Sequence, residues 1–100
     1  MFRKSLEEFL KDNSSKIVID LRKPEDYRKE TIPGAVNVYY KDFFRYTSRL
    51  ARNKRIYLFC YTGETSDEYA EQLSKRGYDI YSIEEGYHAY LRYKLKKMIR

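Results

Sequence analysis

Apolar and polar positions along the chain follow two different periods, which predicts helices and strands that succeed one another. Short apolar runs rich in β-branched or aromatic residues are typical of strands buried in a sheet. The expected strands are residues 16–20, 36–39, 55–59 and 78–83. The expected helices are one that begins at Ser5 and is broken at Asn13, residues 24–29, residues 41–51, one from Thr65 to Gly77, and one from about Tyr87 onward. This alternation predicts one α/β domain, residues 1–100, with helices on both faces of a mainly parallel sheet.

Local signals mark several of the helix ends. Ser5 and Glu8 have the spacing of a capping box, and Thr65 and Glu68 have the same spacing. A glycine such as Gly77 is a common residue just after a helix. The helix that follows the third strand is therefore expected to have Thr65 as its cap.

Composition narrows the class of protein. Hydrophobic residues make up 42% of the chain and charged residues 36%, as in an ordinary globular domain. The single cysteine cannot form an internal disulfide or a thiolate metal cluster, and this usage suits a reducing compartment. Residues 1–12 become acidic where a secretory signal would be apolar, and no apolar run approaches the length of a bilayer span. A cytoplasmic protein without a membrane segment is expected.

The net charge of +6 would favour anionic partners, but 15 acidic residues are interspersed among 21 basic ones. Much of the excess lies in residues 92–100. This tail is expected to be the solvated face of a helix, where cations near the C-terminus are favourable. The alternative is a docking patch for an acidic protein or RNA. Nucleic acid is not the expected partner, because the twelve tyrosines fit packing better than a base-stacking platform.

The stretch LFCYTGETS, residues 58–66, contains the cysteine, Cys60. Cys60 follows a predicted parallel strand, and ligands bind beyond the carboxyl ends of such strands. Backbone N–H groups of a short loop with Gly63 can converge on one point, and the next helix adds the positive end of its dipole. Such surroundings favour a thiolate and would equally stabilise a persulfide. The alternative is an inert cysteine that closes a buried strand.

Three segments carry motifs that resemble one family in order and spacing. The loop has the pattern Cys-x-x-Gly-x-Thr-Ser, beginning at Cys60. Residues 19–27 and 32–37 contain D-x-R, E-x-Y and I-P-G-A-x-N, and residues 77–81 and 85–90 are similar to G-Y-x-V-Y and G-G-x-x-A-W. Together they resemble the rhodanese-domain sulfurtransferases, over about residues 5–93.

The resemblance implies a three-layer sandwich around a sheet of about five strands, with Cys60 as the nucleophile. Cys60 would take the outer sulfur of a donor such as thiosulfate or a persulfide, and a thiophilic acceptor would then remove it. The sulfur would be cradled by the backbone amides of Tyr61, Thr62, Gly63, Glu64, Thr65 and Ser66, with hydroxyl groups adding hydrogen bonds. Tyr61 would wall the pocket. No metal or organic cofactor is implied, and the expected protein is a monomer whose partners are small sulfur compounds or a protein persulfide.

Departures from the family pattern qualify this expectation. Glu64 places a carboxylate beside the thiol, which opposes its ionisation and repels an anionic donor such as thiosulfate. Thr31, Glu85 and Tyr90 replace residues usual in the family and are interpreted as structural. Arg22 is expected to form a structural ion pair with Glu25. His88 is expected at or near the surface, with no Cys–His dyad.

Two other function classes compete with sulfur transfer. A phosphatase or arsenate reductase of related fold needs Cys-x5-Arg, so that a guanidinium can bind the oxyanion. Ser66 stands where that arginine would be, which argues against this class. A non-catalytic binding or regulatory module remains the alternative, because Glu64 is unfavourable for the chemistry.

Overall fold

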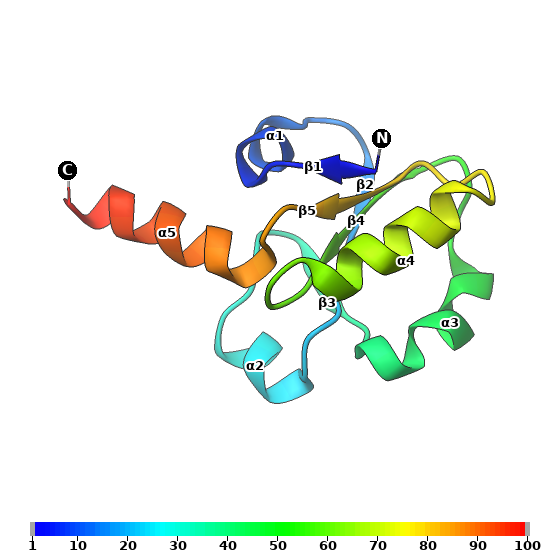
Figure 1. Cartoon of the computed structure of the whole chain (residues 1–100), viewed down its shortest axis with the longest axis horizontal. Helices are drawn as coiled ribbons and strands as arrows, with labels where there is room; N and C mark the ends of the chain where they lie inside the picture. The colour runs from blue at the N-terminus through cyan, green and yellow to red at the C-terminus, as the bar shows by residue number, and fades with distance from the viewer. Residues whose placement is uncertain (1, 100) are drawn as a thin grey trace.

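The β-branched and aromatic runs form a five-stranded parallel sheet in the computed structural model, which describes residues 2–99. The sheet order is β1-β5-β4-β2-β3, so β4 lies at its centre (Figure 1). The strands are β1 (Arg3–Lys4), β2 (Lys16–Asp20), β3 (Ala35–Asn37), β4 (Arg55–Phe59) and β5 (Ile80–Ile83). The α-helices are α1 (Leu6–Lys11), α2 (Pro24–Lys29), α3 (Phe43–Tyr46), α4 (Glu64–Ser74) and α5 (Gly86–Ile99). The prediction of an α/β fold with a parallel sheet is confirmed.

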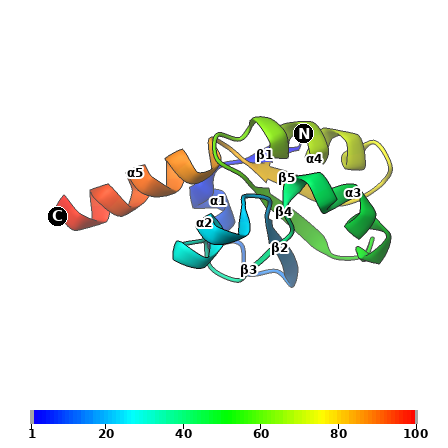
Figure 2. The same cartoon turned by 90° about the horizontal axis from the view of Figure 1, so that it is seen from below.

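Helices cover both faces of the sheet, which gives three layers (Figure 2). Side chains of α3 and α4 form one apolar core with the sheet, and side chains of α1 and α5 form the other. Successive residues of a strand point to opposite faces. Along β4, Leu58 and Cys60 therefore belong to the α3–α4 core, whereas Tyr57 and Phe59 belong to the α1–α5 core. Burial on both sides explains the continuous apolar run of this strand.

Several predicted boundaries need correction. The strand predicted at 36–39 is β3, three residues long, and the one at 78–83 is limited to β5. The helix predicted at 41–51 is broken into a 3-10 turn (Tyr40–Asp42), the short α3 and a second 3-10 turn (Thr47–Arg49). β1 carries no apolar signal, and its two residues pair with β5. The predicted capping box at Ser5 is confirmed.

The predicted cap of α4 is wrong. Gly63 occupies the N-cap position and α4 begins at Glu64, so Thr65 already lies in the first turn. Gly63 has φ +97°, a backbone angle that residues with a Cβ rarely adopt. The chain therefore turns sharply between Cys60 and α4, and the helix starts close to the sulfur.

The last helix extends beyond the sheet. α5 projects away from the body of the domain in both views (Figures 1 and 2). Its first half packs on the sheet through side chains such as Tyr90 and Tyr93, whereas Leu95 and Met98 are exposed. Within residues 2–99, no helix has both the length and the apolar character needed to cross a bilayer.

Candidate active site

Cys60 directly follows the central strand of the sheet. The ends of β2 and β4 lie side by side, with Asp20 opposite Phe59, and the Leu21 N–H donates to the Phe59 carbonyl at 2.8 Å. This pairing holds the last residue of β4 rigidly up to the point where the loop begins. Cys60 is 5% exposed and belongs to the core beneath α3 and α4. The thiol is thus placed by the most central element of the fold.

Two groups of the loop contact the sulfur. The Gly63 N–H donates to Cys60 Sγ at 3.1 Å, and the Cys60 thiol donates to Ser66 Oγ across 3.4 Å. Ser66 is fully buried, and its Oγ lies 2.6 Å from the buried Ser82 Oγ on β5. The Ser66 hydroxyl accepts from the thiol and donates to the Gly63 carbonyl at 3.2 Å. Because a hydroxyl group rotates, Ser66 can leave that carbonyl and donate to a thiolate, while Ser82 supplies the other hydrogen bond. Thiol and thiolate can both be satisfied by these hydroxyls.

Two glycines let the backbone approach closely around this loop. A Cβ on Gly63 would lie 2.9 Å from the Glu85 nitrogen, and one on Gly86 would lie 2.0 Å from the Cys60 carbonyl oxygen. Gly86 therefore sits directly against the Cys60 peptide. The Tyr87 N–H donates to the Cys60 carbonyl at 2.8 Å, and the His88 N–H donates to the Tyr61 carbonyl at 3.3 Å. The N-terminus of α5 thus holds the loop from behind.

A cavity of about 370 Å³ opens in front of the sulfur. Its lining residues come from three loops that follow strands: Leu21, Lys23, Tyr39, Tyr40, Cys60, Tyr61, Thr62, Glu64 and Thr65. The sequence analysis did not identify Lys23, Tyr39 and Tyr40 as part of the site. They lie shortly after β2 and β3, whose carboxyl ends share an edge with that of β4. Placement at the ends of neighbouring parallel strands is the signal that could have found them.

Tyr61 forms part of the wall, as expected. Its hydroxyl donates to Asp26 Oδ2 on α2 and accepts from the Lys23 N–H at 3.4 Å. Burial, followed by the hydrogen bond to Asp26, raises the pKa of Tyr61 above its ordinary value. Tyr61 therefore stays neutral at physiological pH and links the loop that follows Cys60 to α2 and to Lys23, which precedes it.

The loop residues predicted from sequence take different positions around the sulfur. Thr62, Glu64 and Thr65 line the cavity, whereas Ser66 lies buried behind the thiol. Within residues 2–99, Gly63 is the one member of 61–66 whose backbone N–H lies within hydrogen-bond distance of Sγ. The Thr62 hydroxyl instead accepts from the Glu64 N–H at 3.4 Å.

The expected partner of Arg22 is wrong. Its guanidinium pairs with the buried Asp20 at 2.9 Å rather than with Glu25. The Thr31 hydroxyl donates to the same Asp20 carboxylate at 2.7 Å, so Thr31 stabilises the buried ion pair. The charge of Arg22 is thus paired inside the fold. The Arg22 guanidinium also donates to the Glu30 carbonyl, so the Arg22–Asp20 pair connects the end of β2 to residues 30 and 31.

The other three residues considered in the sequence analysis lie at the start of α5. Glu85 has φ +59° and its carboxylate pairs with Arg92. Tyr90 packs edge-on against Phe59. His88 is exposed, as expected.

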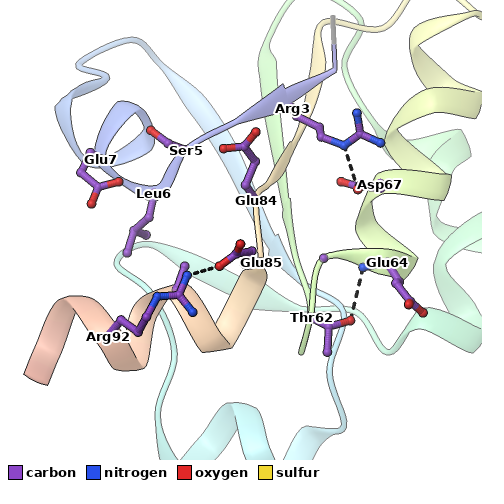
Figure 3. Close-up of a pocket in the computed structure, with 12 residues that line it drawn as sticks. Arg3, Ser5, Leu6, Glu7, Thr62, Glu64, Asp67, Glu84, Glu85 and Arg92 are labelled. Carbon is purple, nitrogen blue, oxygen red and sulfur yellow. Dashed lines mark hydrogen bonds and ion pairs between the residues drawn. The ribbon is translucent and has the colours of Figure 1, made fainter.

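A second cavity, of about 490 Å³, shares Thr62 and Glu64 with the first (Figure 3). Its lining is rich in carboxylates, namely those of Glu7, Glu64, Asp67, Glu84 and Glu85. Arg3 pairs with Asp67 and Arg92 pairs with Glu85 on its walls. Cys60 does not line this cavity. Of these two cavities, only the first is lined by Cys60.

The fold and the loop define a small α/β domain that presents one thiol on a strand–loop–helix turn. The family model of the rhodanese-like domain matches residues 3–93, and the chain belongs to this family. The resemblance stated from the sequence motifs is thereby confirmed.

Solved structures support the fold. A rhodanese-related protein from Thermoplasma volcanium has a TM-score of 0.78 at 23% identity, with 92% of each chain covered. A rhodanese-like domain protein from Staphylococcus aureus has a TM-score of 0.75 at 24% identity, with 89% of this chain and 90% of that one covered. At this level of identity the likeness concerns the fold alone.

Curated relatives have names that concern sulfur. A tRNA sulfurtransferase from Pyrobaculum aerophilum is 37% identical over 67 residues, which are 67% of this chain and 14% of that protein. A putative sulfur carrier protein from Bacillus subtilis is 31% identical over 61 residues, which are 61% of this chain and 33% of that protein. This chain thus spans a small part of the length of the relatives it matches.

Proposed function

We propose that the chain moves sulfane sulfur through a persulfide on Cys60, as a sulfurtransferase or a persulfide carrier. The observation that carries the proposal is the position of Cys60 Sγ, which accepts the Gly63 N–H at 3.1 Å and also lines a cavity. Membership of the rhodanese-like family and the names of the sulfur-related relatives support it. The whole activity of those longer proteins is not carried over.

In the proposed first half-reaction, the Cys60 thiolate attacks the outer sulfur of the donor. A new S–S bond forms on Cys60 while the donor's own bond to that sulfur breaks, and the electron pair leaves with the donor remnant. With thiosulfate the remnant is sulfite, and with a persulfide it is a thiolate. An acceptor thiophile then attacks the outer sulfur on Cys60 and regenerates the thiolate, so the two displacements follow one another on the same residue.

The groups around Sγ can stabilise the negative charge that the sulfur atoms carry during the two displacements. Negative charge moves from Cys60 Sγ to the outer sulfur. The Gly63 N–H already donates to Sγ, and the Ser66 hydroxyl, which accepts from the thiol, can rotate to donate once the sulfur is charged. Charge-assisted hydrogen bonds of this kind are stronger than neutral ones. The N-terminus of α4, which begins at Glu64, adds the positive end of a helix dipole. We assign Tyr61, Thr62, Glu64 and Thr65 to the binding of donor or acceptor.

The proposed setting follows from the same features. We place the domain, residues 1–100, in the cytoplasm as a monomer that uses no metal or organic cofactor. Its partners are a low-molecular-weight donor or acceptor, or a protein persulfide that reaches the cavity. Nucleic acid is not proposed as a partner.

Intact-mass measurement after exposure to thiosulfate or to a persulfide tests this function. We expect the wild-type chain to gain one sulfur, and the gain to disappear on addition of cyanide as acceptor. Cys60→Ser should gain none, because it lacks the attacking thiolate. The proposal is wrong if no donor of either kind adds sulfur to the wild type, and a non-catalytic module would then be favoured.

A further inference from the structure

The cavity in front of Cys60 carries one charge of each sign. Of the described residues that line it, Lys23 is the one cation and Glu64 the one carboxylate. Lys23 precedes α2, and Glu64 begins α4, so the two charges come from different elements. Within residues 2–99, neither side chain forms an ion pair with another residue. Both are exposed and available to a ligand.

The rest of the lining suits a compact organic molecule. Leu21, Tyr39, Tyr40 and Tyr61 line the same cavity as the two charged residues, and apolar and aromatic residues of this kind are typical of small-ligand sites. A volume of about 370 Å³ lies in the range of small-ligand sites. Cys60 lines this cavity as well, so the cation, the carboxylate and the thiol border one space.

This charge pattern does not match thiosulfate well. A dianion gains attraction from Lys23 and meets repulsion from Glu64, and the two effects oppose each other. A zwitterion gains from both groups, because its negative end can face Lys23 and its positive end can face Glu64. Complementary placement of charge is a common source of specificity.

We propose that the preferred donor is a zwitterionic, amino-acid-type persulfide such as cysteine persulfide. Its α-carboxylate is bound by Lys23, its α-ammonium by Glu64, and its outer sulfur faces Cys60. The inference rests on the proposed function, since it assigns the donor class for the same thiol. It also gives Glu64 a role, although the carboxylate is unfavourable for an anionic donor.

The transfer balances without any oxidant or reductant. The Cys60 thiolate forms a bond with the outer sulfur of R–S–SH, and the bond between the two donor sulfurs breaks. The electron pair leaves with the inner sulfur as the thiolate of cysteine. The proton of R–S–SH stays on the outer sulfur, which is now part of the Cys60 persulfide.

Three matched donors separate the two charges. Cysteine persulfide carries both groups, N-acetylcysteine persulfide lacks the ammonium, and cysteamine persulfide lacks the carboxylate. The rate of sulfur addition to Cys60 is measured for each by quenched reaction and intact mass, at equal donor concentration and low ionic strength. We expect the wild type to react fastest with cysteine persulfide, by about twofold to fivefold over either of the others, the range an exposed ion pair supplies.

Two variants should change this preference in different ways. Lys23→Gln should slow the donors with a carboxylate, cysteine and N-acetylcysteine persulfide, and leave cysteamine persulfide unchanged or faster. Glu64→Gln should slow the donors with a free ammonium, and should not slow N-acetylcysteine persulfide. Lys29→Gln and Glu71→Gln remove the same charges at exposed positions on α2 and α4 that do not line the cavity, and they should leave the order of donors unchanged.

The outcomes distinguish this inference from the proposed function. Equal rates for the three donors, in the wild type and in both cavity variants, would overturn the assignment of a zwitterionic donor while sulfur transfer stands. A change of preference in the control variants equal to that in the cavity variants would also overturn it, because the effect would then be one of net charge. Failure of every donor to add sulfur would instead remove the proposed function.

Discussion

Gly86→Ala is expected to lower both stability and the proposed sulfur transfer, because Gly86 lies against the peptide of Cys60. A Cβ at this position would be 2.0 Å from the Cys60 carbonyl oxygen and 2.8 Å from its carbon. Both distances are far inside van der Waals contact, so the two backbones must separate. That separation lengthens the hydrogen bond of 2.8 Å between the Tyr87 N–H and the Cys60 carbonyl.

The size of the effect follows from two contributions. Gly86 has φ +45°, and a residue with a Cβ in the left-handed region costs about 1–2 kcal/mol. Loss of the Tyr87 hydrogen bond costs about 1 kcal/mol. We therefore expect the free energy of unfolding to fall by about 2–3 kcal/mol, or roughly 8–24 °C in Tm for a domain of this size.

Gly34→Ala is the matched control. Gly34 also has a positive φ, +78°, but a Cβ there would meet nothing within 4 Å. Gly34→Ala should therefore lower the free energy of unfolding only by the cost of the backbone strain. It should leave the rate of Cys60 persulfide formation unchanged. Urea denaturation gives the free energies, and quenched intact mass gives the rates. Equal losses of stability in the two variants, with equal transfer rates, would refute the reasoning about Gly86.

Three further predictions concern single side chains. Ser66→Ala should slow persulfide formation about tenfold, because a hydrogen bond to a charged group is lost; an unchanged rate would mean that Ser66 does not contact the reacting sulfur. Glu64→Gln should speed reaction with thiosulfate about twofold to fivefold by removing a like charge, and a slower rate would count against this. Hydrogen bonding by the Ser14 side chain, followed by that of Tyr57, holds the pKa of Asp12 well below its usual range. The stabilisation from this carboxylate is present above the unfolded pKa of about 4 and is lost as pH falls through the lower folded value, so Asp12→Asn should be less stable than wild type at pH 7. That gap should narrow in acid unfolding curves below about pH 4, and a constant gap would contradict the assignment.

The sequence pattern predicts the strands and helices whose own residues carry the signal. It does not predict an element such as β1, which forms only because its backbone pairs with another strand. β2 and β4 were predicted with their observed bounds, because a strand buried on both faces is apolar throughout. β1 contains only Arg3 and Lys4 and forms through backbone pairing with β5, which leaves no side-chain pattern. The capping-box spacing of Thr65 and Glu68 was misleading because the turn is set earlier, by the positive φ of Gly63.

The candidate site likewise contains residues that could be predicted from the sequence and residues that could not. The residues contiguous with Cys60 could be predicted, since strand, loop and helix follow one another in the chain. Lys23, Ser82 and Gly86 come from other strand ends, and their approach to the loop depends on the order of strands in the sheet. Closeness in sequence predicts an ion pair between Arg22 and Glu25. The structure instead pairs the Arg22 guanidinium with the carboxylate of Asp20, the last residue of β2.

The backbone hydrogen bonds between the Cys60 loop and α5 couple the two in folding. A helix leaves its first N–H groups without partners of its own, and here the carbonyls of Cys60 and Tyr61 accept two of them, from Tyr87 and His88. The loop that presents the thiol thus also caps a helix that begins more than twenty residues later. Helix initiation and placement of the thiol then become one cooperative event. A chain in which α5 has not formed lacks two of the hydrogen bonds that hold the Cys60 loop in place.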